Sequence, residues 1–403
     1  MAEKGLTNFF ETYLKKEPIF KNKKVFQSNY VPRIIHHRKK EIETISTILA
    51  PSLKMEKPSN LFVYGKPGTG KTLTVRYVAE KLEEVAKRNN IALMIIYKNC
   101  KLKRVADTEY RLMTELAKCF NEDVPSTGLS TRDVYDIFIE SLDKEKRIAI
   151  LILDEIDELV KESDEVLYTL LRINTELKNS QISIVGISNN WTFLDGLDPR
   201  IKSSLSQEEL MFPPYNALQL QSILKQRAKL AFKPNAVGEG VIEKCAAYAA
   251  REHGDARRAL ELLRIAGEIA ERKGYEKIEI KHLDEAQEKL EKDRIMDIVS
   301  GLTKHSQLVL YSILAAHEQA KEKKPVFTGD IYEFYKKLCF KIRERPLTQR
   351  RVSDIIAEHD MCGLINAKVI SYGRYGRTRE ICLAVSKSQT NNIKETLKEG
   401  LNL

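Results

Sequence analysis

The chain has 403 residues, of which 42% are hydrophobic and 31% are charged, and its formal net charge is +10. This length allows two or three domains, and the apolar content suffices for ordinary folded cores. No run of eighteen apolar residues occurs, which argues against a transmembrane helix. The amino terminus also lacks the basic-then-apolar pattern of a signal peptide. We therefore expect a cytoplasmic protein without a membrane partner.

The charge is distributed unevenly along the chain. Residues 1–40 contain ten Lys or Arg against three Glu, and residues 300–403 contain eighteen against eleven acidic residues, so each end carries +7 and the middle −4. Basic ends around a mildly acidic centre favour a polyanionic partner, although the Lys/Glu-rich surface of a heat-adapted protein is an alternative explanation. Residues 1–28 are predicted to be a basic extension that docks on the domain following it or contacts such a polyanion.

Six cysteines are scattered along the chain without a CxxC pair, at positions 100, 119, 245, 339, 362 and 382. This spacing indicates neither a zinc site nor a disulfide framework. We expect reduced, buried thiols.

A phosphate-binding loop is predicted at residues 65–72. The apolar strand 61–64 runs into "GKPGTGKT" and then into a helix, which is the context that GxxxxGK[ST] requires. Its glycines let successive backbone N–H groups surround an anion, and the helix dipole reinforces that site. Lys71 is expected to reach the β- and γ-phosphates and Thr72 to bind Mg²⁺. The predicted nucleotide contacts here are Gly65, Pro67, Gly68, Thr69, Gly70, Lys71, Thr72 and Leu73.

Two further strands are predicted to end at the same edge of a parallel sheet. The apolar run 148–153 reads as a strand buried on both faces, and its carboxyl end carries Asp154, a Mg²⁺ ligand through water, and Glu155, the group that polarises the attacking water. Strand 182–190 carries Asn189, whose amide is placed to orient that water. Ligands of α/β sheets bind at this edge.

The last hundred residues predict three helices followed by a β-hairpin, which is the pattern of a winged helix. The first helix begins near residue 306, the second spans 328–342, and the third spans 348–360 with Thr348 as N-cap. The hairpin spans 370–385. The third helix is expected to enter the major groove of DNA and the arginine-rich hairpin tip to follow the backbone or minor groove. A protein-docking winged helix is the alternative. The candidate contacts are Arg350, Arg351, Ser353, Arg374, Tyr375 and Arg377.

The order of these motifs resembles an AAA+ ATPase, and more narrowly the archaeal initiator family related to the eukaryotic origin recognition complex and cell division control protein. The resemblance covers nearly the whole chain. It implies an α/β fold: an AAA+ P-loop NTPase core with a parallel sheet at 29–211, an α-helical lid at 212–295 and a C-terminal winged-helix domain at 300–395. The cofactors that it implies are ATP or ADP and Mg²⁺.

The resemblance also assigns residues outside the phosphate-binding loop. "NYVPRIIHHRKKEIETI" (29–45) is similar to the segment that lines the adenine pocket, and "FPPYNALQLQSILKQRA" (212–228) to the entry of the lid. "HGDARRALELLRIAGEIA" (253–270) is similar to the lid helix whose first arginine senses the γ-phosphate. The residues that these similarities assign to the nucleotide are Val31, Pro32, Arg38, Tyr215, Arg227 and, as the sensor, Arg257.

Two more stretches carry expectations about catalysis and DNA. "LDPRIKSSL" (197–205) resembles the segment that supplies an arginine finger, but Ser203-Ser204 stands where many AAA+ proteins have Ser-Arg. Arg200 is therefore the remaining candidate, and weak, switch-like hydrolysis is expected. Initiators also carry an extra helix that touches DNA, which residues 120–142 resemble; an ordinary N-capped surface helix is the alternative. The contacts in that segment are Thr127, Ser130, Thr131 and Arg132.

Taken with the resemblance, the sequence predicts a replication initiator. It is expected to bind double-stranded origin DNA under the control of ATP or ADP, to help recruit and load the replicative helicase, and to work with paralogous initiator subunits on the nucleoid. Two alternatives stay open: a DNA motor of the branch-migration type and an ATP-liganded transcription regulator.

Overall fold

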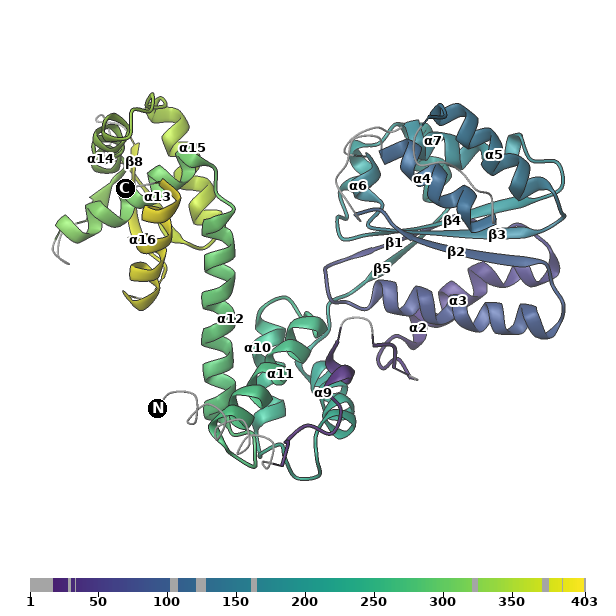
Figure 1. Ribbon diagram of the computed structural model, residues 1–403, viewed down its shortest axis with the longest axis horizontal. Helices are drawn as coiled ribbons and strands as arrows, with labels where there is room; N and C mark the ends of the chain where they lie inside the picture. Colours follow the sequence, from purple (N-terminus) through teal and green to yellow (C-terminus); the bar gives the residue numbers. More distant parts are fainter. Residues whose placement is uncertain are drawn as a thin grey trace, which may run out of the picture. The chain divides into compact units, whose positions relative to one another are not determined.

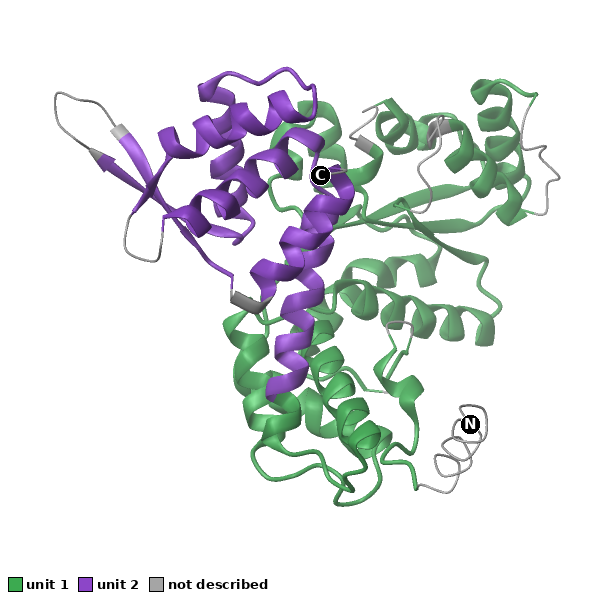
Figure 2. Cartoon of the chain, turned by 60° about the vertical axis from the view of Figure 1, so that its left-hand side comes forward, with its two compact units in different colours: residues 1–283 green, residues 284–403 purple. Residues whose placement is uncertain are grey.

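The computed structural model describes residues 17–27, 30–32, 34–101, 108–120, 128–160, 165–320, 325–371, 377–385 and 387–401. The chain divides into two compact units, residues 1–283 and residues 284–403 (Figure 2). Within the described ranges, every helix is too short or too polar to cross a membrane.

Unit 1 is built on a five-stranded parallel sheet with the strand order β2-β3-β4-β1-β5 (Figure 1). The central strand β3 is buried along its whole length, as its continuous apolar run predicts. The predicted parallel sheet is thus confirmed. The strands are β1 (Leu61–Gly65), β2 (Leu93–Asn99), β3 (Ile148–Asp154), β4 (Gln181–Ser188) and β5 (Glu208–Phe212).

Helices cover both faces of this sheet, because alternate residues of β3 point to opposite sides. Ile150 and Ile152 pack with α2 (Lys39–Leu49) and α3 (Lys71–Arg88). Leu151 packs in the other core with α4 (Thr108–Ala117), α5 (Thr131–Asp143) and α7 (Glu165–Arg172). Figure 1 shows the two helical layers above and below the strands. Two short helices follow β3 and β4: α6 (Asp157–Val160) and α8 (Pro199–Leu205).

A helical lid completes unit 1. Its helices are α9 (Ala217–Ala231), α10 (Val241–Arg251) and α11 (Ala256–Lys273). Asn216 caps α9 in a capping box with Gln219, and the Asp255 carboxylate caps α11. Helix α12 (Ile280–Ser300) then runs without interruption through the charged run around residue 290.

Unit 2 has the predicted winged-helix elements. Helix α13 (Lys304–Gln319), α14 (Thr328–Lys341) and α15 (Gln349–Met361) precede the antiparallel pair β7 (Ile365–Ser371) and β8 (Arg377–Leu383). Thr348 caps α15 as predicted, and Val352, Ile355 and Ile356 lie in the core. Two elements were not predicted: the short strand β6 (Val326–Phe327), which pairs with β8, and the last helix α16 (Lys387–Leu401).

The six cysteines are all free thiols, as expected. Cys245 and Cys339 are buried, and Cys100 and Cys119 are half-buried. The prediction of buried thiols is wrong for Cys362 and Cys382, which are exposed. Cys362 follows the last residue of α15, and Cys382 lies on the two-stranded wing, where one face of the sheet meets solvent.

Candidate functional site

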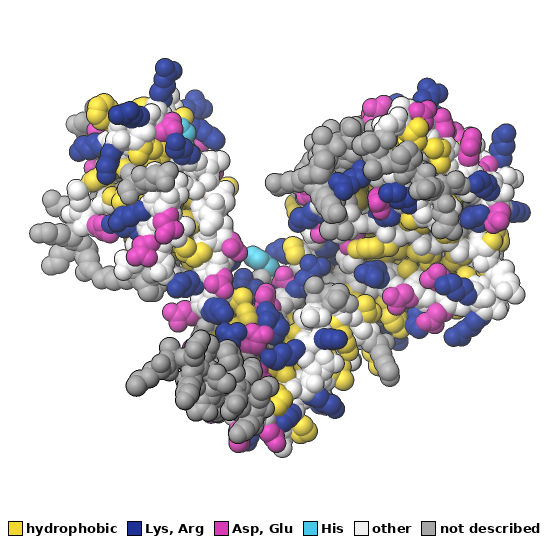
Figure 3. Space-filling view, viewed as in Figure 1, with side chains coloured by type: hydrophobic (Ala, Val, Ile, Leu, Met, Phe, Trp, Pro, Cys, Tyr) yellow, Lys and Arg dark blue, Asp and Glu magenta, His cyan; other side chains and the backbone are white. Residues whose placement is uncertain are grey.

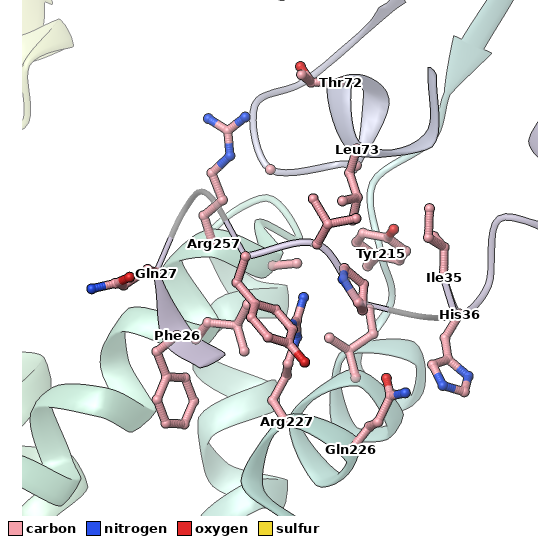
Figure 4. A pocket seen from close by; sticks show the side chains of 18 of the residues that line it. Phe26, Gln27, Ile35, His36, Thr72, Leu73, Tyr215, Gln226, Arg227 and Arg257 are labelled. Atoms are coloured by element: carbon pink, nitrogen blue, oxygen red, sulfur yellow. The ribbon is translucent and has the colours of Figure 1, made fainter. Parts of the chain in front are cut away.

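A cavity of about 810 Å³ lies in unit 1 beside the predicted phosphate-binding loop. Its walls come from the N-terminal segment, the loop, the first turn of α3 and the lid helices α9 and α11 (Figure 4). Parts of the chain that are far apart in sequence therefore meet here. The predicted nucleotide contacts that line it are Val31, Pro32, Gly68, Gly70, Thr72, Leu73, Tyr215, Arg227 and Arg257.

The buried ammonium of Lys71 joins the loop to the end of strand β4. Its Nζ donates to the carbonyl oxygens of Gly65 (2.7 Å) and Lys66 (2.8 Å) and to Oδ1 of Asn189 (2.9 Å). These three acceptors are neutral, and burial together with the charge of Arg257 lowers the pKa of Lys71 to about 8. An anion beside this ammonium would relieve that cost, so the site is suited to a phosphate group. Lys71 and Asn189 thus lie together as the sequence predicts.

The two glycines of the loop that line the cavity have no room for a side chain. Gly68 has φ +71°, and a Cβ there would lie 1.7 Å from Oδ1 of Asp255. Gly70 has φ +89°, and its Cβ would lie 2.8 Å from the Tyr215 hydroxyl. Both conformations favour glycine. The loop therefore lies close against the lid, and its glycine-rich backbone is of the kind that surrounds phosphates.

Three other predicted contacts of this region serve the loop itself. The Thr69 hydroxyl donates to the Lys66 carbonyl at 2.8 Å, and Pro67 is exposed on the outside of the loop. Arg38 is almost fully buried; its Nε donates to the Thr69 carbonyl (2.9 Å) and to the Tyr215 hydroxyl (3.1 Å). Its guanidinium also lies 4.0 Å from the centre of the Tyr215 ring. Arg38 is not among the described residues that line the cavity, so it clamps the loop to the entry of the lid from behind.

The acidic pair at the end of β3 is arranged by its neighbours. Oδ2 of Asp154 accepts from the hydroxyls of Thr72 (2.9 Å) and Tyr97 (2.7 Å), and Oδ1 accepts from the Glu155 amide (3.0 Å). Glu155 has φ +55°, and its Oε2 lies 3.5 Å from Nζ of Lys101. A hydroxyl and a carboxylate side by side are the oxygen donors that Mg²⁺ prefers, so Thr72 and Asp154 fit the ion.

Tyr97 is a site residue that the sequence analysis missed. It lies near the carboxyl end of β2, which pairs with β3 in parallel register. Burial and the hydrogen bond to Asp154 raise the pKa of Tyr97, so the phenol stays a proton donor at neutral pH. The only signal available was a polar residue at the end of an otherwise apolar strand.

Two lid arginines lie in the cavity wall (Figure 4). Arg257 is exposed on the first turn of α11, and its charge reaches Lys71. Arg227 on α9 is 6% exposed; its guanidinium lies 4.4 Å from the centre of the Tyr30 ring, and Nη1 donates to the Val25 carbonyl at 3.4 Å. Burial lowers the pKa of Arg227. Arg257 is thus available to a bound anion, whereas the guanidinium of Arg227 already contacts Val25 and Tyr30 in the cavity wall.

The finger candidate Arg200 lies elsewhere. It is 71% exposed on α8, and its Nε and Nη2 donate to the two oxygens of Asp198 at 3.1 and 3.0 Å. The described lining residues of the cavity do not include it. Within one chain the structure therefore does not bring Arg200 to the phosphate-binding loop.

The predicted DNA contacts of unit 1 lie at the start of α5. Ser130 is the N-cap in a capping box, where Asp133 N–H donates to its Oγ at 3.2 Å and Oγ donates to Asp133 Oδ2 at 2.7 Å. Arg132 is exposed and Thr131 half-buried. Thr127 lies outside the described residues. The predicted helix start is confirmed, and the hydroxyl of Ser130 is engaged in its own helix.

In unit 2 the predicted DNA contacts lie on the first turns of α15. Arg350 and Arg351 are exposed, and Arg351 lies 3.7 Å from Glu358. Nη1 of Arg379 on β8 donates to the Ser353 carbonyl at 2.7 Å and ties the wing to this helix. On the face shown in Figure 3, Lys and Arg side chains gather at the end of unit 2 that holds α14 and α15. Arg374, Tyr375 and the side chain of Arg377 lie outside the described residues.

Three family models match the chain. They are described as AAA domain at residues 54–191, Cdc6 AAA+ ATPase-type lid domain at 221–288, and CDC6, C terminal winged helix domain at 297–393.

The chain is also similar to curated proteins of archaea. It is 50% identical over 398 residues to the ORC1-type DNA replication protein of Thermococcus onnurineus, covering 98% of this chain and 95% of the relative. It is 49% identical over 389 residues to ORC1-type DNA replication protein 1 of Methanosarcina mazei, covering 96% and 93%. Among solved structures, the Aeropyrum pernix ORC1 protein in complex with DNA is 42% identical, with a TM-score of 0.78 over 95% of this chain and 98% of that chain.

Proposed function

This chain belongs to the family of ORC1-type DNA replication proteins, and on that premise we propose that it is a replication initiator that binds origin duplex DNA under the control of ATP and ADP. Its AAA domain and ATPase-type lid are those of a nucleotide-dependent protein. The DNA complex of the Aeropyrum ORC1 protein supports the choice of DNA as the partner.

One observation carries the nucleotide part of the proposal: the Lys71–Asn189 and Thr72–Asp154 hydrogen bonds converge at one sheet edge, beside a cavity lined by the loop and the lid. We assign Lys71 and the loop amides to the phosphates. Thr72 and Asp154 would hold Mg²⁺, which when bound neutralises phosphate charge.

The remaining polar groups at the sheet edge and on the lid act on the attacking water and the γ-phosphate. Glu155 takes the role of general base and Asn189 orients the water. Arg257 senses the γ-phosphate from the lid.

Hydrolysis by a single chain is proposed to be weak, so that ATP works as a switch. An arginine finger contributes roughly 10³–10⁵ in rate where it is present. Arg200 faces solvent and pairs with Asp198, and Ser204 offers no cation. Arg200 would act in trans: the Arg200 of one subunit would reach the nucleotide bound to a second initiator subunit, identical or paralogous.

DNA binding is assigned mainly to unit 2. The exposed Arg350 and Arg351 at the start of α15 are placed for bases or phosphates of the major groove, with Ser353 one turn further on. The wing residues Arg374, Tyr375 and Arg377 would follow the backbone or minor groove. The start of α5, with Thr127, Ser130, Thr131 and Arg132, is a second proposed contact.

The wider biological role rests on the family alone. We propose that the bound initiator helps recruit and load the replicative helicase, on the nucleoid in the cytoplasm. We also propose that the chain is divided into an N-terminal extension (1–28), a core (29–211), a lid (212–295) and a winged helix (300–395).

Footprinting of the purified protein across its source genome, with and without ATP at physiological salt, tests the proposal. Protection concentrated at one or a few replication start sites, and lost when Arg374 and Arg377 are both replaced by Ala, is the expected result. Protection spread over many promoters would favour a transcription regulator. Binding only to branched DNA would favour a motor.

A further inference from the structure

The segment before the ATPase core is bound to the lid. We call residues 17–27 the N-terminal strap. Phe20 forms a β-bridge with Phe232, just beyond the end of α9, and the Lys21 amide donates to the Ala231 carbonyl at 2.8 Å. The strap therefore adds backbone hydrogen bonds to the end of a lid helix more than 200 residues away in sequence.

Aromatic packing fixes the strap between two lid helices. The ring centroids of Phe20 and Phe26 lie 4.8 and 5.4 Å from that of Phe232, and all three side chains are buried. On α11, a Cβ at Gly267 would lie 2.7 Å from the Phe20 ring, so only glycine admits the ring there. Each buried aromatic ring contributes a large apolar area. The apolar residues Ile19, Phe20, Val25 and Phe26 of the strap are thus buried as core residues are, whereas the rest of the strap is exposed.

An ion pair adds to this packing. Glu271 on α11 accepts from the Ile19 amide at 3.2 Å and from Nζ of Lys23 at 2.7 Å. Glu271 is 13% exposed, so water screens the pair less than it screens the exposed Glu17–Lys233 pair. Glu271 thus holds the strap at two points, Ile19 and Lys23.

The far end of the strap enters the wall of the nucleotide cavity. Phe26 and Gln27 line that cavity, opposite the loop that carries Thr72 and Leu73 in Figure 4. The buried Arg227 links this end to the lid, because it donates to the Val25 carbonyl and packs on the Tyr30 ring. The same residues therefore dock the strap and shape the cavity.

We infer that the N-terminal strap is part of the nucleotide-binding site: its last residues, Phe26 and Gln27, contribute to the wall opposite the phosphate-binding loop. The apolar and aromatic surface of that wall suits a purine base. The inference rests on the proposed nucleotide binding. Because the strap and the nucleotide share this wall, each stabilises the other by the same free energy, as linkage requires. A bound nucleotide should hold the strap down, and a loosened strap should release the nucleotide faster.

Limited trypsin digestion of the full chain tests the first half of this reciprocity. Lys21, Lys23 and Lys24 are exposed on the strap, and their cleavage can be followed by mass spectrometry of the released peptides. After bound nucleotide has been stripped, added ADP should slow cleavage at these sites by about threefold or more, while cleavage at exposed lysines of α14, such as Lys337, keeps its rate. Equal rates at the strap with and without ADP would contradict the inference.

Dissociation of a fluorescent ADP analogue tests the second half. Phe26→Ala removes part of the wall, and Phe20→Ala removes the anchor behind it without touching the cavity; each should speed dissociation by about tenfold. Glu271→Gln, which keeps the packing and an acceptor for the Ile19 amide, should speed it by about two- to threefold. Phe340→Ala, at an exposed ring of unit 2, is the control and should leave it unchanged.

The outcomes separate this inference from the proposed function. If the unaltered protein binds no ADP analogue, the nucleotide site itself is wrong and the strap inference falls with it. If it binds the analogue but Phe20→Ala and Phe26→Ala leave dissociation unchanged, only the strap inference is overturned. A melting temperature of each variant, measured without nucleotide, shows whether a faster rate merely reflects unfolding.

Discussion

The nucleotide cavity and the winged-helix surface are built in opposite ways. Beside the cavity the charged side chains of Lys71 and Asp154 are buried, and each is hydrogen-bonded to a neutral side chain, Lys71 to Asn189 and Asp154 to Thr72. On the winged helix, Arg350 and Arg351 stand exposed on the first turn of α15. A small ligand needs a few preformed hydrogen-bond donors in a closed site. A long polyanion is bound by many exposed cations, each of which contributes a similar share of the binding free energy. A single substitution at the cavity should therefore nearly abolish nucleotide binding or hydrolysis, whereas each substitution on the winged-helix surface should weaken DNA binding only in part.

The sharpest test of this difference is Lys71→Ala. It removes the buried ammonium on which the loop and Asn189 converge, so the Kd for ADP or ATP should rise by about 100-fold or more, the scale of lost charge-assisted hydrogen bonds. Titration calorimetry measures the change, with Arg350→Ala as the control that leaves it unaltered. Near-normal affinity in Lys71→Ala would place the nucleotide elsewhere.

Glu155→Gln should separate binding from chemistry. The amide keeps the shape of the side chain but cannot accept the proton of the attacking water, so hydrolysis should fall by about 100-fold while ATP affinity stays the same. Phosphate release under single-turnover conditions measures the rate. Turnover at the unaltered rate would show that Glu155 is not the base.

Much of the nucleotide site could be predicted because its residues follow strand ends. Lys71, Asp154 and Asn189 stand after three apolar strands, and parallel strands bring their carboxyl ends to one edge. Tyr97 could not be found in this way, since the target of its hydroxyl depends on the β2–β3 register, which no motif records. The packing of Phe20 could not be predicted for a similar reason, because its partner Phe232 is distant in sequence.

On the winged-helix surface, each loss of arginine side chains should weaken DNA binding by a moderate factor. Replacing Arg350 and Arg351 by Ala, or Arg374 and Arg377 by Ala, should weaken duplex binding by about tenfold at physiological salt, and each lost phosphate contact should lower the salt slope by about 0.9. Fluorescence anisotropy across a salt series measures both. Lys225→Ala, on the lid helix α9, is the control. An unchanged salt dependence of binding would mean that the altered pair of arginines does not contact DNA phosphates.

The winged-helix elements themselves were only partly predictable. Helix α15 has a clear N-cap at Thr348 and a regular apolar face, and the hairpin alternates as strands do. Strand β6 has two residues and is defined by its pairing with β8 alone. Helix α16 is mostly polar; Ile393 and Leu397 pack in the unit 2 core, and Lys394 pairs with Glu318 of α13.

Tyr97→Phe should have a smaller effect than the changes to Lys71 or Glu155. It deletes one donor to Asp154 and keeps the ring, so the carboxylate is held less firmly for the metal. We expect the Mg²⁺ concentration for half-maximal nucleotide binding to rise by about fivefold, while affinity without Mg²⁺ stays unchanged. Tyr77→Phe on α3 is the matched control. An unchanged Mg²⁺ requirement would mean that Tyr97 serves only the fold.

The smallest expected effect concerns His359, which is a buried basic side chain like Lys71 but lies in the other unit. Lys71 would gain a phosphate partner on nucleotide binding under the proposed function, whereas His359 lies in the unit 2 core away from any proposed ligand. Its Nε2 lies 3.1 Å from the Ser306 carbonyl oxygen, and within the described chain its buried Nδ1 has no hydrogen-bond partner. Burial lowers the pKa of His359 below its ordinary value of 6.5. As the pH falls below about 6.5, His359 takes up a proton in the unfolded chain before it does so in the folded chain. Acidification therefore lowers the free energy of unfolding of unit 2. The melting temperature of unit 2 should fall between pH 7 and pH 5, and His359→Gln, which keeps a donor for Ser306, should reduce that fall by a few degrees. Parallel pH profiles for the two proteins would show that another group causes the loss.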